Sequence, residues 1–335
     1  MKNIIVTGGN GFIGKAIINE LSKNDNIKIF NIDINLENEL NLPNVKSYNL
    51  DLTTETLQGM FPKDIKIDLV IHLASPIGVA NITNHASETF HNAILINTNI
   101  LSYCKFNDIP LIFASSSEVF GAGDVHTDKN VYKLPSASQT DRGSYALQKI
   151  LMEYEMKFSQ LHSTVVRFFN IVGPGQTTPG MILPTFINQA LNNETLIIKE
   201  NGLRSYCDVN DMVIQMLIII NEHLNTDYKN TFERFRTINI GNPTIDNKLY
   251  ASEVAELVID RVTNAGFNTK SEILFDHNYA DTSEIPRRFF YQENKYNNEI
   301  DNIQLSTTID NIIKSIQAEK KLQLEIKKEQ YNELV

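Results

Sequence analysis

Residues 7–14 read TGGNGFIG, and they lie between an apolar run at 3–8 and a helical pattern at 12–23. Gly8, Gly11 and Gly14 permit a tight turn, close approach of the backbone to a pyrophosphate, and close packing of the helix on the strand. The N-terminus of a helix that follows such a turn offers unpaired N–H groups and the positive end of a dipole to phosphate. This stretch therefore predicts the strand–turn–helix of a dinucleotide-binding fold.

A carboxylate follows the glycine turn at the spacing that such a fold requires. Asp33 ends the apolar run 27–33, 19 residues after Gly14. Its carboxylate would accept hydrogen bonds from the adenosine ribose and repel a 2′-phosphate, which favours NAD over NADP. Asp51 lies in LDL (50–52), at the end of the next predicted strand run, 45–52. It either holds the adenine amino group or caps a helix over 53–60, and the sequence leaves both roles open.

The first half of the chain alternates short apolar runs with helical patterns. Apolar runs without polar alternation are typical of strands buried on both faces, and strand–helix alternation favours a parallel, doubly wound sheet. The predicted strands cover 3–8, 27–33, 45–52, 67–75, 110–117 and 163–170, and the predicted helices cover 12–23, 86–106 and 143–160. We therefore predict an α/β, Rossmann-type fold with its NAD-binding domain at residues 1–172.

After residue 172 the pattern changes. A Gly/Pro-rich loop at 173–181 leads into helical patterns at 181–193, 208–223 and 249–265 and short strands near 196–199, 236–240 and 272–275. We predict a smaller C-terminal α/β substrate lobe at 173–320, some of whose strands return to the main sheet. Residues 321–335, in a charged helical pattern that begins at 315, are predicted to form a solvated terminal helix.

Composition restricts the classes of partner. The 335 residues carry a net charge of −10, which disfavours sequence-independent binding of nucleic acid. Two cysteines are too few for a disulfide framework or a metal cluster and are typical of a reducing compartment. The longest apolar run, at 212–220, is too short to span a bilayer. We expect a cytoplasmic protein without a metal, nucleic-acid or membrane partner.

Tyr145 and Lys149 are four residues apart in a helical pattern, so they share one helix face. Tyrosine has a reference pKa of about 10 and is a poor base at neutral pH, but an adjacent ammonium favours the phenolate. The phenolate can then accept a proton from a substrate hydroxyl. Ser116, in the strand end ASSSEVFG at 114–121, would stabilise the same oxygen. An ordinary exposed helical pair fits the spacing too, but the glycine turn and the serine-rich strand end favour catalysis.

Five motifs occur in one order along the chain: TGGNGFIG, HLAS at 72–75, SSSEVFG at 115–121, YALQK at 145–149 and RFFNIVGPG at 167–175. This set resembles the extended short-chain dehydrogenase/reductases that modify nucleotide sugars, over about residues 1–320. The resemblance implies that bound NAD oxidises C4 of the sugar, and that the resulting 4-ketone permits epimerisation, dehydration or decarboxylation. It also implies a homodimer in which the helices at 86–106 and 143–160 form a four-helix contact with a second copy.

The resemblance assigns roles to individual residues. Tyr145 would be the base, Lys149 would hold the nicotinamide ribose, and Ser116 would be the catalytic hydroxyl. The cofactor-binding residues would be Gly8, Gly11, Phe12, Ile13, Gly14, Asp33, Asp51, Leu52, Leu73, Ala74, Ser75, Asn92, Tyr145 and Lys149, with Asn97 as a rival to Asn92. The substrate-binding residues would be Ser116, Ser117, Arg142, Asn170, Arg204 and one or both of Arg287 and Arg288. A diphosphate suits a planar, permanently charged donor such as Arg204.

The type of reaction depends on Glu118. The run Ser116-Ser117-Glu118 is similar to the strand end of UDP-glucuronate decarboxylases and some sugar-nucleotide dehydratases, whereas the stretch at 167–186 is more similar to the epimerases. Glu118 would act as a second acid/base at C5 or C6; the other interpretation is a cap on the following turn. Three hypotheses stay open: an epimerase, dehydratase or UDP-glucuronate decarboxylase-like enzyme with a 4-keto intermediate, a plain UDP-hexose 4-epimerase, and a non-catalytic NAD- or nucleotide-sensing protein.

Overall fold

A seven-stranded sheet forms the centre of the computed structural model, which describes residues 1–37, 39–76, 84–120, 142–177, 180–199, 201–225, 227–276, 296 and 300–333. The strands are β1 (Lys2–Thr7), β2 (Ile27–Asp33), β3 (Val45–Asn49), β4 (Leu69–His72), β5 (Leu111–Ser116), β6 (Ser163–Phe168) and β11 (Phe235–Ile240). Their order is β11-β6-β5-β4-β1-β2-β3, and every neighbouring pair is parallel. The predicted Rossmann-type parallel sheet is confirmed.

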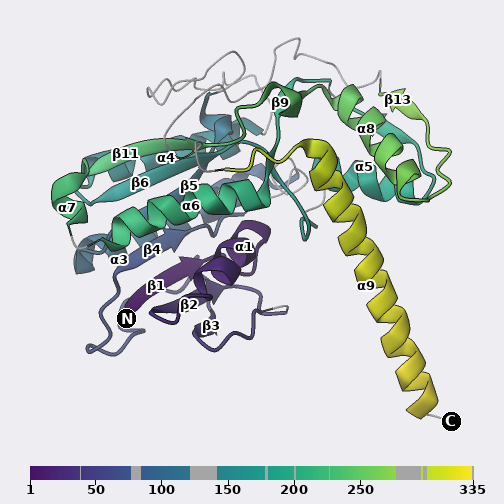
Figure 1. The fold of residues 1–335 in the computed structure, drawn as a ribbon. Helices are drawn as coiled ribbons and strands as arrows, with labels where there is room; N and C mark the ends of the chain where they lie inside the picture. Colours follow the sequence, from purple (N-terminus) through teal and green to yellow (C-terminus); the bar gives the residue numbers. More distant parts are fainter. Residues whose placement is uncertain are drawn as a thin grey trace.

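Helices cover both faces of this sheet (Figure 1). Side chains alternate between the faces of a strand, so Ile4 and Val6 of β1 enter one core cluster and Ile5 enters another. The first cluster is closed by α1 (Phe12–Leu21) and α6 (Val209–Leu224), and the second by α3 (Ala86–Asn107) and α4 (Arg142–Phe158). Because both faces of the sheet are covered, the central strands contain short apolar runs such as IIV in β1 and LVI in β4, which is the pattern visible in the sequence.

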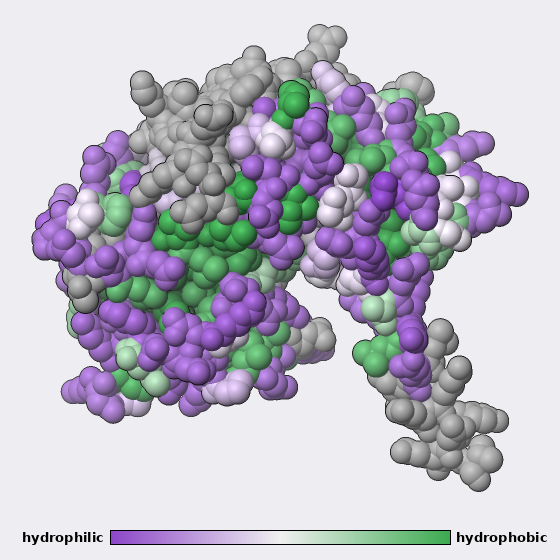
Figure 2. Space-filling model, viewed as in Figure 1, coloured by the Kyte–Doolittle hydropathy of each residue, from purple (hydrophilic) through white to green (hydrophobic). Residues whose placement is uncertain are grey.

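The face that carries α1 and α6 is drawn in Figure 2, where apolar side chains gather over α6 within a largely hydrophilic surface. Ile214, Leu217 and Ile218 of this helix are half-buried. None of the helices among the described residues combines the length and apolar character needed to cross a membrane.

A third core cluster lies at one end of the molecule (Figure 1). It is built from α5 (Ile182–Leu191), α8 (Ala251–Asn264) and the first turns of α9 (Leu305–Glu333), together with the parallel pair β8 (Leu196–Ile198) and β13 (Ile273–Phe275). The remaining short elements are η1 (Ser117–Phe120), β7 (Ile171–Val172), β9 (Arg204–Ser205), β10 (Cys207–Asp208), α7 (Tyr228–Thr231), η2 (Ile245–Asn247) and β12 (Lys248–Leu249).

The charged C-terminal pattern is part of a longer helix than its sequence suggests. α9 is continuous over 29 residues, and Leu305, Ile309, Ile312 and Ile313 are buried against α5 and α8. Beyond these turns the helix extends away from the body of the molecule (Figure 1). The charged residues after 315 therefore continue a helix whose beginning is anchored in a hydrophobic core.

The sequence left two roles open for Asp51, and one of them, the cap of a helix over 53–60, is not observed. Residues 53–60 make turns rather than a helix. Gly59 has a left-handed φ of +74°, and Thr53 and Thr54 are β-branched, so this stretch is poorly suited to a helix. The carboxylate of Asp51 instead accepts hydrogen bonds from the N–H and hydroxyl of Thr53, at 2.9 Å and 2.7 Å.

Candidate active site

Two adjoining cavities of about 490 Å³ and about 300 Å³ lie at the carboxyl ends of the central strands. The strand order reverses at β1, next to β4, and ligands of open α/β sheets bind at such a switch point. Gly8, Gly11, Leu73 and Ser75 line both cavities. We call the larger one the Asp33 cavity and the smaller one the Tyr145 cavity.

The glycine turn forms the wall between the cavities. Gly8 has a φ of +71°, and a Cβ at this position would lie 2.7 Å from the backbone nitrogen of Ala74. A Cβ on Gly14 would collide with the carbonyl oxygen of Gly8. Gly11 is the N-cap of α1 and brings no side chain, and the first turn holds no acidic residue. The N-terminal N–H groups of this ten-residue helix therefore suit the diphosphate of a dinucleotide.

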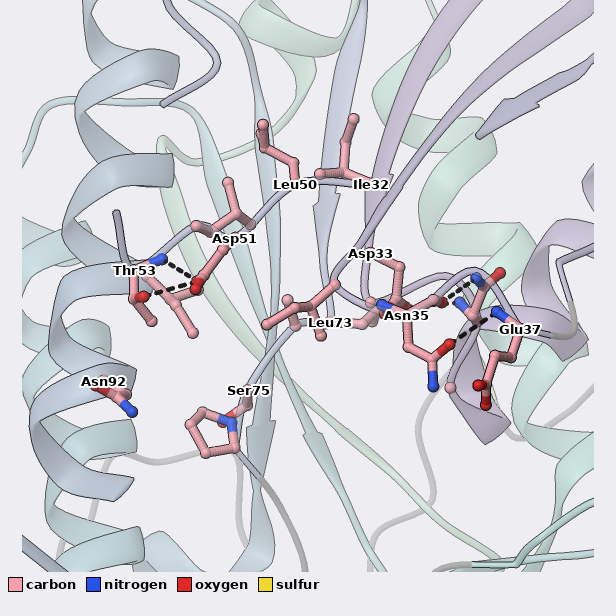
Figure 3. Close-up of a pocket in the computed structure, with 18 of the residues that line it drawn as sticks. Ile32, Asp33, Asn35, Glu37, Leu50, Asp51, Thr53, Leu73, Ser75 and Asn92 are labelled. Carbon is pink, nitrogen blue, oxygen red and sulfur yellow. Dashed lines mark hydrogen bonds between the residues drawn. The ribbon is translucent and has the colours of Figure 1, made fainter. Parts of the chain in front are cut away.

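Asp33 is held at the edge of its cavity by backbone donors (Figure 3). Its Oδ2 accepts the N–H of Asn10 at 2.9 Å, and its Oδ1 accepts the N–H of Asn35 at 3.1 Å. The carboxylate is thus tied to the glycine turn itself. Across the cavity, Asp51 and Thr53 form the opposite wall. Two hydrogen bonds from Thr53 hold the pKa of Asp51 below its ordinary value. The bond from the hydroxyl has the larger effect, and the bond from the N–H has the smaller one.

The structure separates the two asparagines that the sequence left as rivals. Asn92 lines the Asp33 cavity, together with Leu52, Leu73, Ala74 and Ser75. Asn97 is buried, and its Oδ1 lies 3.1 Å from Nε2 of His72, whose Nδ1 lies 2.7 Å from the hydroxyl of Thr7. Burial, reinforced by the charge of Lys149, lowers the pKa of His72 to about 3, so the ring is neutral. This chain of polar contacts fixes the end of β4 below the cavity.

The Tyr145 cavity brings the predicted chemical groups together. Its lining includes Ser116, Ser117, Glu118, Tyr145 and Lys149 beside Phe12, Ile13 and Gly14 of the glycine turn. β5 ends at Ser116, whose Oγ accepts the N–H of Glu118 at 3.2 Å as the chain enters η1. The hydroxyl therefore caps this short helix at the place where it faces the cavity.

Lys149 is almost fully buried beside the tyrosine. Its Nζ lies 5.6 Å from the ring centroid of Tyr145 and 4.9 Å from that of Phe113, and it donates to the carbonyl oxygen of Ala114 at 2.9 Å. Burial lowers the pKa of Lys149 to about 7, and the charge of Glu153 opposes this change. An ammonium next to the phenol stabilises the phenolate, which is what a tyrosine base requires.

The expected substrate residues are distributed unevenly. Asn170 lines the Tyr145 cavity in a left-handed conformation, with φ of +40°, and its Nδ2 donates to the carbonyl oxygen of Ser205 at 2.8 Å. Arg204, in β9, lines neither of the two cavities. Arg142 begins α4, but its side chain lies outside the described residues, as do Arg287 and Arg288.

Several lining residues were not predicted from the sequence, and three of them serve as examples. Gln176 and Met181 line the Tyr145 cavity, and Lys15 lines the Asp33 cavity. The first two belong to the Gly/Pro-rich loop at 173–181, where loop composition indicates no direction for a side chain. Lys15 directly follows Gly14, and this position beside the glycine turn could have indicated that Lys15 lines the cavity. Among the residues that the structure describes, no cluster of His, Cys, Asp and Glu could hold a metal ion.

Residues 4–241 match the family model described as the NAD dependent epimerase/dehydratase family. Among curated proteins, the chain is 26% identical over 255 residues to UDP-glucuronic acid decarboxylase 6 of Arabidopsis thaliana, covering 72% of this chain and 69% of that protein. It is 30% identical over 243 residues to the UDP-N-acetyl-alpha-D-glucosaminuronate decarboxylase of Bacillus cytotoxicus, covering 68% and 74%.

Solved structures agree on the fold. The dTDP-glucose 4,6-dehydratase of Bacillus anthracis, solved in complex with NAD, superposes with a TM-score of 0.73 at 19% identity, over 96% of this chain and 98% of that one. The family model spans well over half of the chain and includes the glycine turn, the strand end at Ser116 and the Tyr145–Lys149 helix. The chain therefore belongs to the NAD dependent epimerase/dehydratase family, and it is an NAD-dependent enzyme.

Proposed function

We propose that this enzyme oxidises C4 of a nucleoside-diphosphate sugar and then carries out a second step at C5 or C6. The observation that supports this proposal is the lining of the Tyr145 cavity. Glu118 faces the same 300 Å³ space as Tyr145, Lys149 and the glycine turn. A base for C4 and a second acid/base are thus available to one bound sugar.

In the first step, the phenolate of Tyr145 removes the proton from the C4 hydroxyl. Bound NAD would accept the hydride from C4 and later return it. The ammonium of Lys149, beside the Tyr145 ring, keeps the phenolate accessible near neutral pH. The hydroxyl of Ser116 is proposed to hold the C4 oxygen, and the residues of the Asp33 cavity are proposed to hold the adenosine half of the cofactor.

The second step is proposed for Glu118. In a 4-keto hexuronate, the ketone is β to the C6 carboxylate, so the C5–C6 bond can break with release of carbon dioxide and the electron pair passes to the ketone. Glu118 would then help to return a proton to C5. The chain is similar to two decarboxylases whose names specify UDP-linked hexuronates. This similarity favours decarboxylation, and a UDP-linked hexuronate as the substrate. In a dehydration, Glu118 would instead remove the C5 proton before water leaves from C6.

The arginines Arg142, Arg204, Arg287 and Arg288 remain proposals for the diphosphate and for a C6 carboxylate, because both groups suit a planar cationic donor. A plain UDP-hexose 4-epimerase is the second candidate, and it would not require a carboxylate at position 118. A non-catalytic NAD- or nucleotide-sensing protein would need none of Ser116, Tyr145 and Lys149, and membership in an enzyme family argues against it.

A substrate panel tests the proposed function. The purified enzyme is supplied separately with UDP-glucuronate, UDP-N-acetylglucosaminuronate, UDP-glucose, UDP-N-acetylglucosamine and dTDP-glucose, and products are identified by mass spectrometry and NMR. We expect a UDP-hexuronate to lose carbon dioxide. Loss of water would assign a dehydratase, and unchanged mass with inverted C4 would assign an epimerase. The absence of product and of transient NADH with all substrates would contradict the proposal.

We also propose that the enzyme acts in the cytoplasm as a homodimer through α3 and α4. An apolar stripe on α4 supports this dimer: Leu151, Tyr154 and Phe158 are 46%, 43% and 69% exposed at helical spacing. On α3, Phe106 is 80% exposed. Exposed apolar side chains gathered on paired helices are typical of an interaction surface.

A charge on this stripe should dissociate the dimer. In Leu151→Glu, association would bury an unpaired carboxylate in each copy, so we expect the dissociation constant to rise at least about tenfold. Light scattering during size-exclusion chromatography over a range of concentrations measures the change. Leu322→Glu is the matched control, because Leu322 is 57% exposed on α9 and lies outside α3 and α4. An unchanged mass in Leu151→Glu at every concentration would exclude this surface.

A further inference from the structure

A buried ion pair lies beneath the Tyr145 cavity. Glu153 of α4 and Arg167 of β6 are both 0% exposed. Nε of Arg167 lies 3.1 Å and 3.2 Å from the two carboxylate oxygens of Glu153, and Nη2 lies 2.5 Å from Oε2. The hydroxyl of Ser115 donates to Oε1 of Glu153 at 2.5 Å. The guanidinium also lies over the ring of Phe120, 4.9 Å from its centroid.

This pair connects three elements that carry groups of the cavity. Glu153 is one helical turn beyond Lys149 on α4. Ser115 directly precedes Ser116 at the end of β5, and in the parallel register it is the partner of Arg167 in β6. The pair therefore holds α4 against the two strands at the level where the tyrosine, the lysine and the strand-end serine meet.

Stability alone does not explain such a pair. Taking two charges out of water costs several kcal/mol per ion, and replacing a buried pair with apolar residues is often neutral or stabilising. A pair at this place has an electrostatic consequence, since the negative member is close to a buried lysine. Burial drives the pKa of Lys149 down to about 7, and the charge of Glu153 counteracts it.

We propose that Glu153 and Arg167 act together as positioning residues that set the proton affinity of Lys149. Glu153 supplies the negative charge that keeps the buried lysine protonated, and Arg167 limits that effect by neutralising part of the charge. The inference relies on the proposed function for the role of Lys149 beside the catalytic tyrosine. It concerns only groups of this chain, so it can be tested without a substrate.

The surroundings of Lys149 contain few competing charges among the described residues. One helical turn before and after it, the titratable groups on its own helix are Tyr145 and Glu153, and Glu118 of η1 lines the same cavity. From β4, His72 faces it as a neutral ring, and β5 contributes the Ala114 carbonyl and the Phe113 ring. Arg167 donates to Glu153. The two members of the pair should therefore act on the lysine with opposite signs.

Because Glu153 and Arg167 carry opposite charges, removing each of them should shift the pKa of Lys149 in opposite directions. Glu153→Gln keeps an acceptor for Ser115 but leaves the charge of Arg167 near Lys149, so the pKa of the lysine should fall by about one pH unit or more. Arg167→Met removes the cation that contacts Glu153, so the charge of Glu153 should act more strongly on Lys149 and the pKa of the lysine should rise. The double variant removes one charge of each sign, so the pKa should lie between the values of the two single variants.

The measurement is an NMR titration of protein that carries ¹³C at the ε carbon of lysine, with Lys149→Met to assign the signal. It is made on the substrate-free protein, and melting curves establish that each variant is folded. Movement of the two single variants in the same direction, or no movement in either, would overturn the proposal. If Glu153→Gln does not fold, Arg167→Met alone tests the proposal. This variant retains the carboxylate of Glu153, so the pKa of Lys149 is still predicted to rise.

Activity provides the second readout. With the substrate that the panel identifies, the alkaline limb of the pH–rate profile should move to lower pH in Glu153→Gln and to higher pH in Arg167→Met, and in the double variant it should lie between these two. A role limited to packing would lower turnover without moving these limbs in opposite directions. If the lysine titrations move as predicted but no panel substrate reacts, the proposed function fails and the charge coupling stands.

Discussion

Replacing Tyr145 with phenylalanine is expected to leave the fold and the bound NAD intact while turnover falls by about 10²–10⁴. The substitution removes one oxygen from a side chain that lines the 300 Å³ cavity and changes nothing else in its shape. Without the phenol, the group proposed to accept the C4 proton as hydride leaves is missing. Turnover is measured with the panel substrate, and NAD content is measured by absorbance after denaturation of the protein.

Tyr154→Phe is the matched control for this prediction. Tyr154 lies on the same helix, but its side chain is 43% exposed. Its loss of a hydroxyl should leave turnover near the original level. Near-normal turnover in Tyr145→Phe would remove Tyr145 from the role of base, and loss of NAD from that variant would mean that the hydroxyl serves cofactor binding instead.

Glu118→Gln is expected to stop the reaction after oxidation of C4, at the step in which a proton is moved at C5. Glutamine has nearly the same size and can still form hydrogen bonds, but it cannot exchange a proton at C5. We therefore expect the rate of final product formation to fall by about 10² or more. NADH and a 4-keto sugar should accumulate on the enzyme. The absorbance of NADH in a single turnover, together with mass spectrometry of the quenched sugar, measures this arrest.

Glu256→Gln provides the comparison, because Glu256 is an exposed glutamate on α8 and lines neither cavity. It should behave as the unmodified enzyme. Full product formation by Glu118→Gln would assign Glu118 to a capping role, and plain 4-epimerisation would then become the leading function. Accumulation of NADH only in Glu118→Gln would separate the second step from the first.

The fold was predictable because its determinants are local. Buried parallel strands contain short apolar runs, and the turn after the first strand needs glycine at positions 8 and 14, where a Cβ would collide with neighbouring backbone. The clustering of Ser116, Glu118, Tyr145 and Lys149 also followed from the topology, since neighbouring parallel strands bring their carboxyl ends to one edge.

What the sequence did not reveal depends on contacts between distant elements. Asn92 and Asn97 lie on one helix, and the contact between Oδ1 of Asn97 and Nε2 of His72 in β4 is what separates their positions. A helix over 53–60 was one of two possibilities for the stretch after Asp51, but the carboxylate of Asp51 accepts hydrogen bonds from Thr53 within a turn. Arg167 lies within an apolar run, and only the packing of α4 on β6 shows that it meets Glu153.

The narrow overlap between the two cavities has a consequence for how enzymes of this design can diverge. Among the described residues, only Gly8, Gly11, Leu73 and Ser75 border both spaces, so Asp33 and Asp51 share neither cavity with Glu118, Gln176 or Met181. The residues proposed to set coenzyme preference and those proposed to set the reaction outcome therefore lie on separate surfaces. Protein engineers could exchange one set of side chains for another without redesigning its neighbour, as long as the glycines between them are retained.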